Sequence, residues 1–412
     1  MNNTAIIVKI NNIEKHPNAD NLQIVRLFGT QVITGMDTKL GDLMIYFDSN
    51  LKLSSRYLSA NNLYRHSVLN ADSTKIGYFD DNGRVKAIKL RGEFSDGVLL
   101  PLESLLNLDD DISLNMDEGT EFTELNKYKI CEKYIVPVEK VKDVSGNKIR
   151  KSKTTSPMFV MHWDSDQYMR NKHQIPADIF IYIEEKVHGT SQRTGNVIVS
   201  RNLPRILVFI NKLFGFKITK ENKYTVLNGT RRTILTPNSV GFHDNSMRDD
   251  LYHKVKTYLF KGEEIYTEII GFENTGRYIQ KGFPYGCDPV GLIKNRVILY
   301  RVTMNNEDGI TVDYSRDAVY SRAEELGLEK PTLLKKFHYT GTQYSKIRLD
   351  ELVLELCQGR STLDDNTLRE GVVLWFMNKH GKWTCLKHKS EAFKEFESKA
   401  KDKGEGDIED IL

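Results

Sequence analysis

The chain has 412 residues, which is more than one hydrophobic core usually organises, so its length favours two domains. It contains 59 basic and 56 acidic residues, and the net charge of +3 is too small to indicate a polyanionic partner by itself. No apolar run approaches the roughly 20 residues that cross a bilayer, and the N-terminus lacks the features of a signal peptide. We therefore expect a cytoplasmic protein, in the host cytoplasm if the source is viral, with no membrane partner.

The cysteines are widely spaced and form no C-x-x-C pair. They are Cys131, Cys287, Cys357 and Cys385. This pattern indicates neither a disulfide framework nor a structural zinc site, so we expect reduced, buried thiols.

Short segments of β-type composition, separated by turn residues, occupy the first hundred residues. They lie at 5–10, 23–28, 31–33, 43–47, 83–90 and 98–100. Strands of this length at this spacing are typical of a small barrel or sandwich. We predict an OB-like β-barrel within residues 1–137.

A change of composition follows this predicted barrel. Residues 138–156 are rich in lysine and arginine and contain no aromatic side chain, which predicts a basic linker. Beyond it, strands are expected at 179–184, 197–200, 264–271, 297–303, 371–376 and 383–387, and helices at 246–260 and 344–358. We predict an α+β domain over 157–396 and a charged tail over 397–412.

A lysine at the end of a predicted strand is the first candidate for chemistry. The sequence EEKVHGTS, at 184–191, directly follows the apolar segment 179–183. Lys186 can present its amine to a cleft from this position, and Gly189 would allow the backbone to approach a ligand closely. K-x-x-G alone is common by chance, but the sequence has no P-loop and no dinucleotide-binding motif.

Further short motifs follow Lys186 along the chain. They are YTEIIG at 266–271, ILYRV at 298–302, EGVV at 370–373 and LKHK at 386–389. The series resembles motifs I, III, IIIa, IV and V of the covalent nucleotidyltransferase superfamily of ligases and capping enzymes. The motif KVHG, with its histidine, resembles the form found in the RNA ligase branch of that superfamily.

The N-terminal half carries a second resemblance. An OB-like module ahead of the catalytic domain is similar to one group of RNA ligases, and three segments match that group: GRVKAIKLRG (83–92), SDGV (95–98) and NGTRR (228–232). HPNADNL, at 16–22, resembles a turn of tRNA-binding OB modules. The resemblance implies an α+β fold in which an OB-like β-barrel precedes a nucleotidyltransferase domain similar to ATP-grasp ligases and built on antiparallel sheets.

The same resemblance implies an activity. We expect an ATP-dependent RNA ligase that joins 3′-OH and 5′-phosphate RNA ends in RNA repair, through AMP carried on Lys186 and with Mg²⁺ or Mn²⁺. A monomer is expected. A DNA ligase or capping nucleotidyltransferase of the same fold stays open, as does a non-enzymatic RNA-binding protein with a tRNA-binding type of OB module.

Side-chain chemistry agrees with this expectation. Lys186 must be neutral to attack the α-phosphorus, whereas an unperturbed lysine has a pKa of about 10.4. Lys387 and Lys389 alternate on a predicted strand and so point to one face, where they are expected to lower the pKa of Lys186 and hold the α-phosphate. Glu370 precedes a buried-looking strand and is assigned to the metal.

Other residues are assigned to the nucleotide. Glu268 resembles an acid that positions the nucleotide through ribose hydroxyls, and Tyr300 is the candidate for stacking on adenine. Arg170 is expected to contact a phosphate. The remaining predicted nucleotide-binding residues are Glu185, His188 and Gly189, which flank or follow the lysine.

Basic and aromatic residues interleave between positions 200 and 232. Basic residues neutralise phosphates and aromatic rings stack on bases, so this segment is a candidate RNA-contacting element, although a solvated insertion fits equally well. The predicted RNA-binding residues are Arg201, Arg231 and Arg232. The OB-like module is expected to help hold RNA, so removing 1–137 would impair strand joining more than adenylylation of Lys186.

Overall fold

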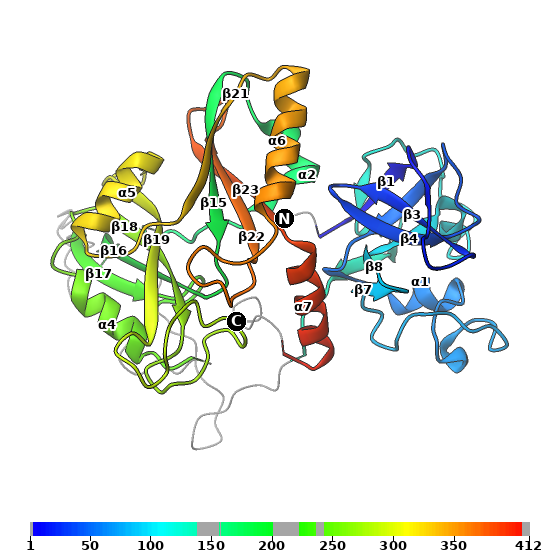
Figure 1. The fold of residues 1–412 in the computed structure, drawn as a ribbon, viewed down its shortest axis with the longest axis horizontal. Coiled ribbons are helices and arrows are strands. Elements are labelled where there is room, and N and C mark those ends of the chain that lie inside the picture. The colour runs from blue at the N-terminus through cyan, green and yellow to red at the C-terminus, as the bar shows by residue number, and fades with distance from the viewer. Residues whose placement is uncertain (1–2, 138–155, 157, 201–221, 236–242, 406–412) are drawn as a thin grey trace, which may run out of the picture.

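The computed structural model describes residues 3–137, 156, 158–200, 222–235 and 243–405. An N-terminal β-barrel lies beside a larger α+β domain, and helix α7 (Glu391–Asp402) lies between them (Figure 1). This arrangement confirms the predicted fold class. The basic linker and Arg201 lie outside the described residues, apart from Ser156, whose hydroxyl donates to the Ile198 carbonyl.

The barrel is built from short antiparallel strands. One sheet has the order β10 (Glu121–Phe122), β1 (Ala5–Lys9), β5 (Leu43–Phe47) and β9 (Val98–Pro101). A second contains β2 (Glu14–Lys15), β3 (Leu22–Leu27) and β4 (Thr30–Gly35), and β7 (Ala87–Leu90) pairs with β8 (Glu93–Asp96). The pairs of β6 (Leu51–Leu53) with β13 (Cys131–Lys133) and of β11 (Glu124–Leu125) with β12 (Tyr128–Lys129), together with helix α1 (Ser55–Ala60), complete the barrel.

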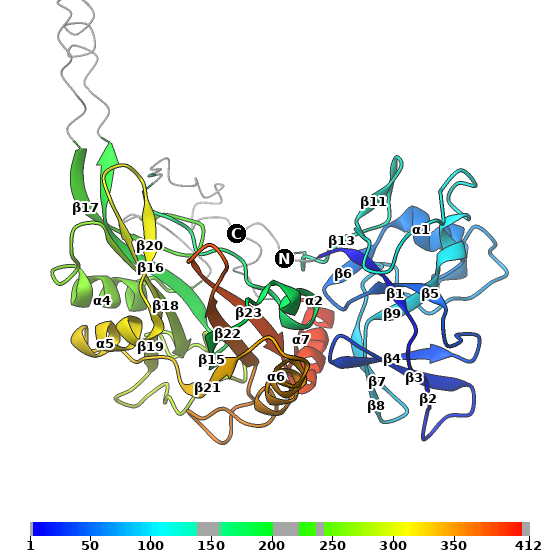
Figure 2. The same cartoon turned by 90° about the horizontal axis from the view of Figure 1, so that it is seen from above.

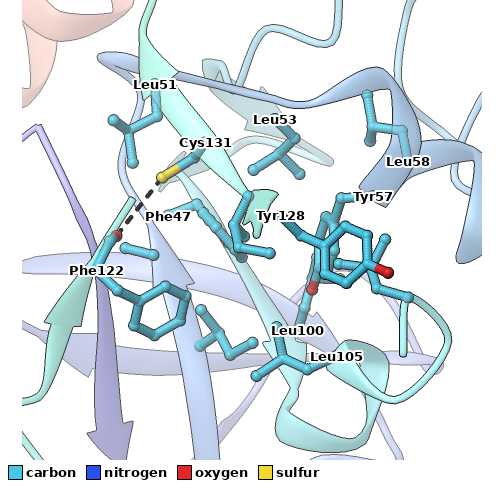
Figure 3. Close-up of a cluster of buried hydrophobic side chains, with 14 of the residues drawn as sticks. Phe47, Leu51, Leu53, Tyr57, Leu58, Leu100, Leu105, Phe122, Tyr128 and Cys131 are labelled. Carbon is cyan, nitrogen blue, oxygen red and sulfur yellow. Dashed lines mark hydrogen bonds between the residues drawn. The ribbon is translucent and has the colours of Figure 1, made fainter. Parts of the chain in front are cut away.

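Apolar side chains fill this domain. Phe47, Leu51 and Tyr57 are almost fully buried in one cluster, and the Cys131 thiol contacts the Phe122 carbonyl at 3.8 Å (Figure 3). Each such side chain contributes about 1.5–3 kcal/mol when it leaves water, which gives this small domain a core of its own. All four cysteines are free and buried, as predicted.

The HPNADNL turn has a structural task in the barrel. The Asn18 N–H donates to His16 Nδ1 at 3.1 Å, so the other ring nitrogen, Nε2, carries the proton toward the Leu90 carbonyl, also at 3.1 Å. The Asn18 side chain donates to the Arg91 carbonyl at 3.0 Å. These contacts tie the turn before β3 to the β7–β8 hairpin.

The α+β domain contains two five-stranded sheets. The first has the order β17 (Asn222–Gly229), β16 (Thr190–Ser200), β18 (Glu263–Gly271), β19 (Asn295–Asn305) and β20 (Thr311–Asp313). The second has the order β14 (Asp166–Gln167), β23 (Trp383–Lys389), β22 (Gly371–Met377), β15 (Ile179–Lys186) and β21 (Leu333–Tyr339), and its β14–β23 pair is parallel. The second sheet lies nearer to the barrel (Figure 2).

Helices cover these sheets. Helix α6 (Gln343–Leu356) buries Leu349, Leu352 and Val353 against the second sheet, and α5 (Arg316–Glu325) packs on β19. Helix α4 (Ser246–Val255) is shorter than the predicted 246–260, and α2 (Tyr168–Asn171) is a single turn. No helix among the described residues is both long and apolar enough to span a membrane.

Helix α7 crosses the predicted boundary between the α+β domain and the charged tail. The Ser390 hydroxyl accepts from the Phe393 N–H and caps a helix that continues to Asp402, six residues past the predicted domain end at 396. Phe393 is fully buried and anchors α7, whose last turns belong to the segment that composition marked as a charged tail.

Candidate active site

A cavity of about 210 Å³ opens in the α+β domain. Strands of both sheets contribute to its wall, as does helix α7 through Glu397. The predicted residues that line it are Glu185, Lys186, Arg231, Glu268, Tyr300, Glu370, Lys387 and Lys389.

Strand register brings the lysines together. Lys186 is opposite Gly371 in the β15–β22 pair, and Gly371 is opposite Lys389 in the β22–β23 pair. Lys186 Nζ donates to Glu370 Oε2 at 2.9 Å, and Lys389 Nζ lies 3.8 Å from Glu370 Oε1. These three charged residues, together with Lys387 of the same cavity, form one charge cluster.

Helix α7 adds a carboxylate that no sequence pattern had indicated. Glu397 Oε2 accepts from Lys389 Nζ at 3.1 Å, and its other oxygen lies 3.3 Å from Lys401 Nζ. The helical spacing of Phe393 and Phe396 could have indicated a buried face here, but it gives no reason to place Glu397 in the cavity.

The charges of this cluster shift its pKa values. Burial raises the pKa of Glu370, but Lys186 and Lys389 outweigh it and hold the pKa below its usual range. Glu397 is likewise held low, mainly by Lys389, against the effect of burial. Burial and the charges of Lys389 and Lys186 lower the pKa of Lys387 to about 8. Both carboxylates are therefore ionised at neutral pH. For Lys387, burial and repulsion by the neighbouring lysines make the charged form less favourable.

Glu268 holds the loop that follows Lys186. Its two oxygens accept from the Gly189 N–H and the Ser191 hydroxyl, each at 3.1 Å. A Cβ at position 189 would lie 2.3 Å from the Ile269 carbonyl oxygen. Glycine is thus required here for packing against β18, and its predicted role in the approach of a ligand stays a prediction.

Two of the predicted nucleotide-binding side chains are directed at protein partners. The His188 ring lies edge-on to Phe283 and Phe393, with centroids 5.0 and 5.1 Å away, and is not part of the cavity wall. The Glu185 carboxylate accepts from the Thr362 N–H and hydroxyl at 2.9 and 2.6 Å. Glu185 still lines the cavity, and His188 Nδ1 lies 3.9 Å from Glu370 Oε2, so both side chains support the loop around Lys186 at the edge of the site.

An aromatic wall lines one end of the cavity. Tyr300 meets His162 edge-on at 5.2 Å, Trp163 meets Trp375 at 6.2 Å, and the Arg301 guanidinium lies 3.7 Å above the Trp163 ring. Tyr300 was the predicted stacking residue, whereas the other three rings were missed, because a tryptophan or histidine in a strand or loop is ordinarily core.

Arg170 does not reach this cavity. Its guanidinium lies 3.5 Å from Asp48 and 3.4 Å from Glu121, and it donates to the Thr4 carbonyl at 3.2 Å. All three partners belong to the barrel, so the structure corrects the predicted phosphate contact: Arg170 joins the two domains.

The predicted RNA-binding arginines separate in the structure. Arg231 lines the cavity and forms an ion pair with Asp164, so it belongs to the same site as Lys186. Arg232 is exposed to solvent.

The donors available for a divalent cation are carboxylates of the charge cluster. Glu370 and Glu397 are both ionised and border the cavity, which suits a hard cation that prefers oxygen. Within the described ranges, no group of three or more His, Cys, Asp and Glu side chains is arranged to hold a metal. These residues therefore fit a cation that is held partly through water.

Comparisons with known proteins find the same fold. A family of OB-fold domains matches residues 4–102. The structure matches an apo variant of a Naegleria gruberi RNA ligase with 16% identity and a TM-score of 0.58, covering 97% of this chain and 100% of the other. A variant of the same ligase with ATP and Mn matches with 15% identity and a TM-score of 0.55, covering 96% and 97%.

A third variant of that ligase, with AMP and Mn, matches with 15% identity and a TM-score of 0.56, covering 96% and 98%. No curated protein sequence matches the chain. The chain therefore has an OB-fold domain at its N-terminal side and shares its overall two-domain fold with this Naegleria gruberi RNA ligase.

Proposed function

We propose that the chain is an ATP-dependent RNA ligase that joins RNA 3′-OH and 5′-phosphate ends through a lysyl-AMP intermediate on Lys186. One observation carries the proposal: Lys186 Nζ lies 2.9 Å from the buried Glu370, in a cavity that also contains Lys387, Lys389 and an aromatic wall. Such a site offers a nucleophile, cations for a triphosphate and a surface for a base.

In the first step, the Lys186 amine attacks the α-phosphorus of ATP. Lys186 first gives its ammonium proton to Glu370 or solvent; the neutral nitrogen then bonds to the phosphorus, the bond to the bridging oxygen breaks and pyrophosphate leaves. Lys387 and Lys389 stabilise the negative charge that builds on the α-phosphate oxygens. Catalysis in this step is mostly positioning and charge stabilisation.

Mg²⁺ or Mn²⁺, held by Glu370 and Glu397 directly or through water, would supply further neutralisation of the phosphate charge. The fold neighbours were solved with ATP or AMP and Mn, which supports this choice of cofactors. Tyr300, with the neutral His162 beside it, offers a ring face for adenine.

The second and third steps involve RNA. The 5′-phosphate of one strand attacks the lysyl-AMP phosphorus and releases Lys186, and the neighbouring 3′-OH then displaces AMP to form the phosphodiester. Arg231, which lines the cavity, is placed to meet a 5′-phosphate, and the OB-fold domain at 1–137 provides the additional RNA surface.

A strand-joining assay tests the proposal against its alternatives. RNA strands with 3′-OH and labelled 5′-phosphate ends, and the same strands as DNA, are incubated with the protein, Mg²⁺ or Mn²⁺, and either ATP or GTP. ATP-dependent joining of RNA is expected. Joining restricted to DNA would indicate a DNA ligase, and covalent labelling by GTP without joining would indicate capping chemistry.

A further inference from the structure

Helix α7 has one face in the charge cluster. Glu397 lines the cavity and accepts from Lys389 Nζ at 3.1 Å. One turn earlier, the fully buried Phe393 lies under Lys389, with Nζ 5.0 Å from the ring, and against the His188 ring at 5.1 Å. A movement of α7 would therefore move a carboxylate and an aromatic ring that both contact Lys389.

A neighbouring face of α7 is held by the OB-fold domain. The Arg84 side chain is fully buried and donates to the Ser398 carbonyl at 2.9 Å and to Asp402 Oδ1 at 2.6 Å. The Ala87 N–H donates to the Ser398 hydroxyl at 3.2 Å. The barrel thus binds Ser398, the residue that directly follows Glu397, through both its backbone and its side chain. Strand β7 and helix α7 lie side by side in Figure 1.

A second buried contact fixes the beginning of the helix. Lys394 Nζ donates to Asp96 Oδ2 at 2.7 Å, and the Asp96 carboxylate also accepts from the Ser49 hydroxyl at 2.6 Å. The Lys394 and Asp96 side chains are 15% and 4% exposed, so the position of α7 relative to the barrel is set at two largely buried points. Charge pairs of this kind hold geometry because either partner left alone in the interface is unfavourable.

We infer that Arg84, in the OB-fold domain, is a positioning residue for lysine adenylylation, acting through α7 on Glu397 and Lys389. The inference rests on the proposed function. Displacements of about 1 Å at a reacting site reduce rates by roughly 100-fold, so loss of the Arg84 contacts is sufficient to slow the first step. Adenylylation needs no RNA, so this effect is separate from any RNA binding by the barrel.

The OB-fold domain would then contribute to adenylylation of Lys186 as well as to RNA binding. If the barrel only held RNA, removing 1–137 would spare the reaction of Lys186 with ATP. The contacts of Arg84 and Asp96 with α7 instead make the first step depend on the barrel.

The experiment measures single-turnover transfer of AMP from α-labelled ATP to the full-length protein, without RNA. Arg84→Ala is expected to lower the maximal rate about 10- to 100-fold, with a smaller change in the ATP concentration that gives half the maximal rate. Arg84→Lys should recover part of the rate. Arg56→Ala is the matched control, because Arg56 is an exposed arginine of the same domain that stacks on Tyr128.

A double variant separates positioning from general damage. Glu397→Gln alone should lower the rate, and Arg84→Ala/Glu397→Gln should fall no further, because both changes act through one carboxylate. If Arg84→Ala does not fold, Asp402→Ala removes its partner at the half-exposed end of the helix and is expected to lower the rate several-fold.

The outcomes distinguish the two proposals. Wild-type labelling together with a slowed Arg84→Ala protein supports both. Wild-type labelling with an unchanged Arg84→Ala rate, or losses that multiply in the double variant, overturns the role of Arg84 only. Absence of label on the wild type overturns the proposed function itself.

Discussion

Lys387 is expected to destabilise the protein while no nucleotide is bound. Burial and the charges of Lys389 and Lys186 lower its pKa from 10.5 to about 8. At about 1.4 kcal/mol per pH unit, this difference corresponds to about 3 kcal/mol of lost stability. The side chain is partly open to the cavity, and solvent screening there reduces the expected loss of stability to about 1–2 kcal/mol.

Lys387→Met removes the charge and keeps most of the volume. We expect it to raise the free energy of unfolding at pH 7 by about 1–2 kcal/mol, or the melting temperature by about 2–8 °C, while adenylylation is lost. The folded pKa lies below the unfolded one, so the penalty is complete below pH 8 and fades as pH rises from 8 to 10.5. The gain in the free energy of unfolding from Lys387→Met should therefore be much smaller at pH 9.5 than at pH 7.

Thermal and urea unfolding at the two pH values provide the assay. Lys382→Met is the control, because Lys382 is an exposed lysine in the turn between β22 and β23. The reasoning would be refuted by a Lys387→Met protein that is less stable than wild type at pH 7, or by a gain that is the same at pH 7 and pH 9.5.

Three further substitutions have defined outcomes. Arg316→Met should cost about 3–5 kcal/mol in urea unfolding, because Glu184, which now accepts from Arg316 at 2.6–2.8 Å, would be left charged and buried; a loss below 1 kcal/mol would contradict this. Gly189→Ala should destabilise by about 1–3 kcal/mol and slow adenylylation, because the new Cβ meets the Ile269 carbonyl at 2.3 Å; unchanged labelling kinetics would speak against it. Tyr300→Ala should raise the ATP concentration for half-maximal labelling about tenfold, whereas Tyr300→Phe should leave it within about twofold; equal effects of the two would exclude stacking.

The fold was predictable where patterns are local. Strand alternation located β5 (Leu43–Phe47) at its observed bounds and β18 and β22 to within a residue. The spacing of Leu349, Leu352 and Val353 located α6. Helix α5 and strand β21 were missed, because the strand is partly exposed and the helix has its few buried side chains among charged residues.

The central part of the site was also predictable, since alternation on one strand puts Lys387 and Lys389 on the same face. The rest depends on long-range packing. Glu397 enters the cavity only because Phe393 anchors α7 and Arg84 holds its other face, and no local pattern records either contact. Arg170 likewise finds its partners in another domain.

The most direct measurement is covalent labelling of Lys186. Purified wild type and Lys186→Ala are incubated with Mg²⁺ and α-labelled ATP, denatured, and examined for label on the protein. Label on the wild type and none on Lys186→Ala is the predicted result. Equal labelling of both proteins, or no label on folded wild type with either Mg²⁺ or Mn²⁺, would contradict the lysyl-AMP mechanism.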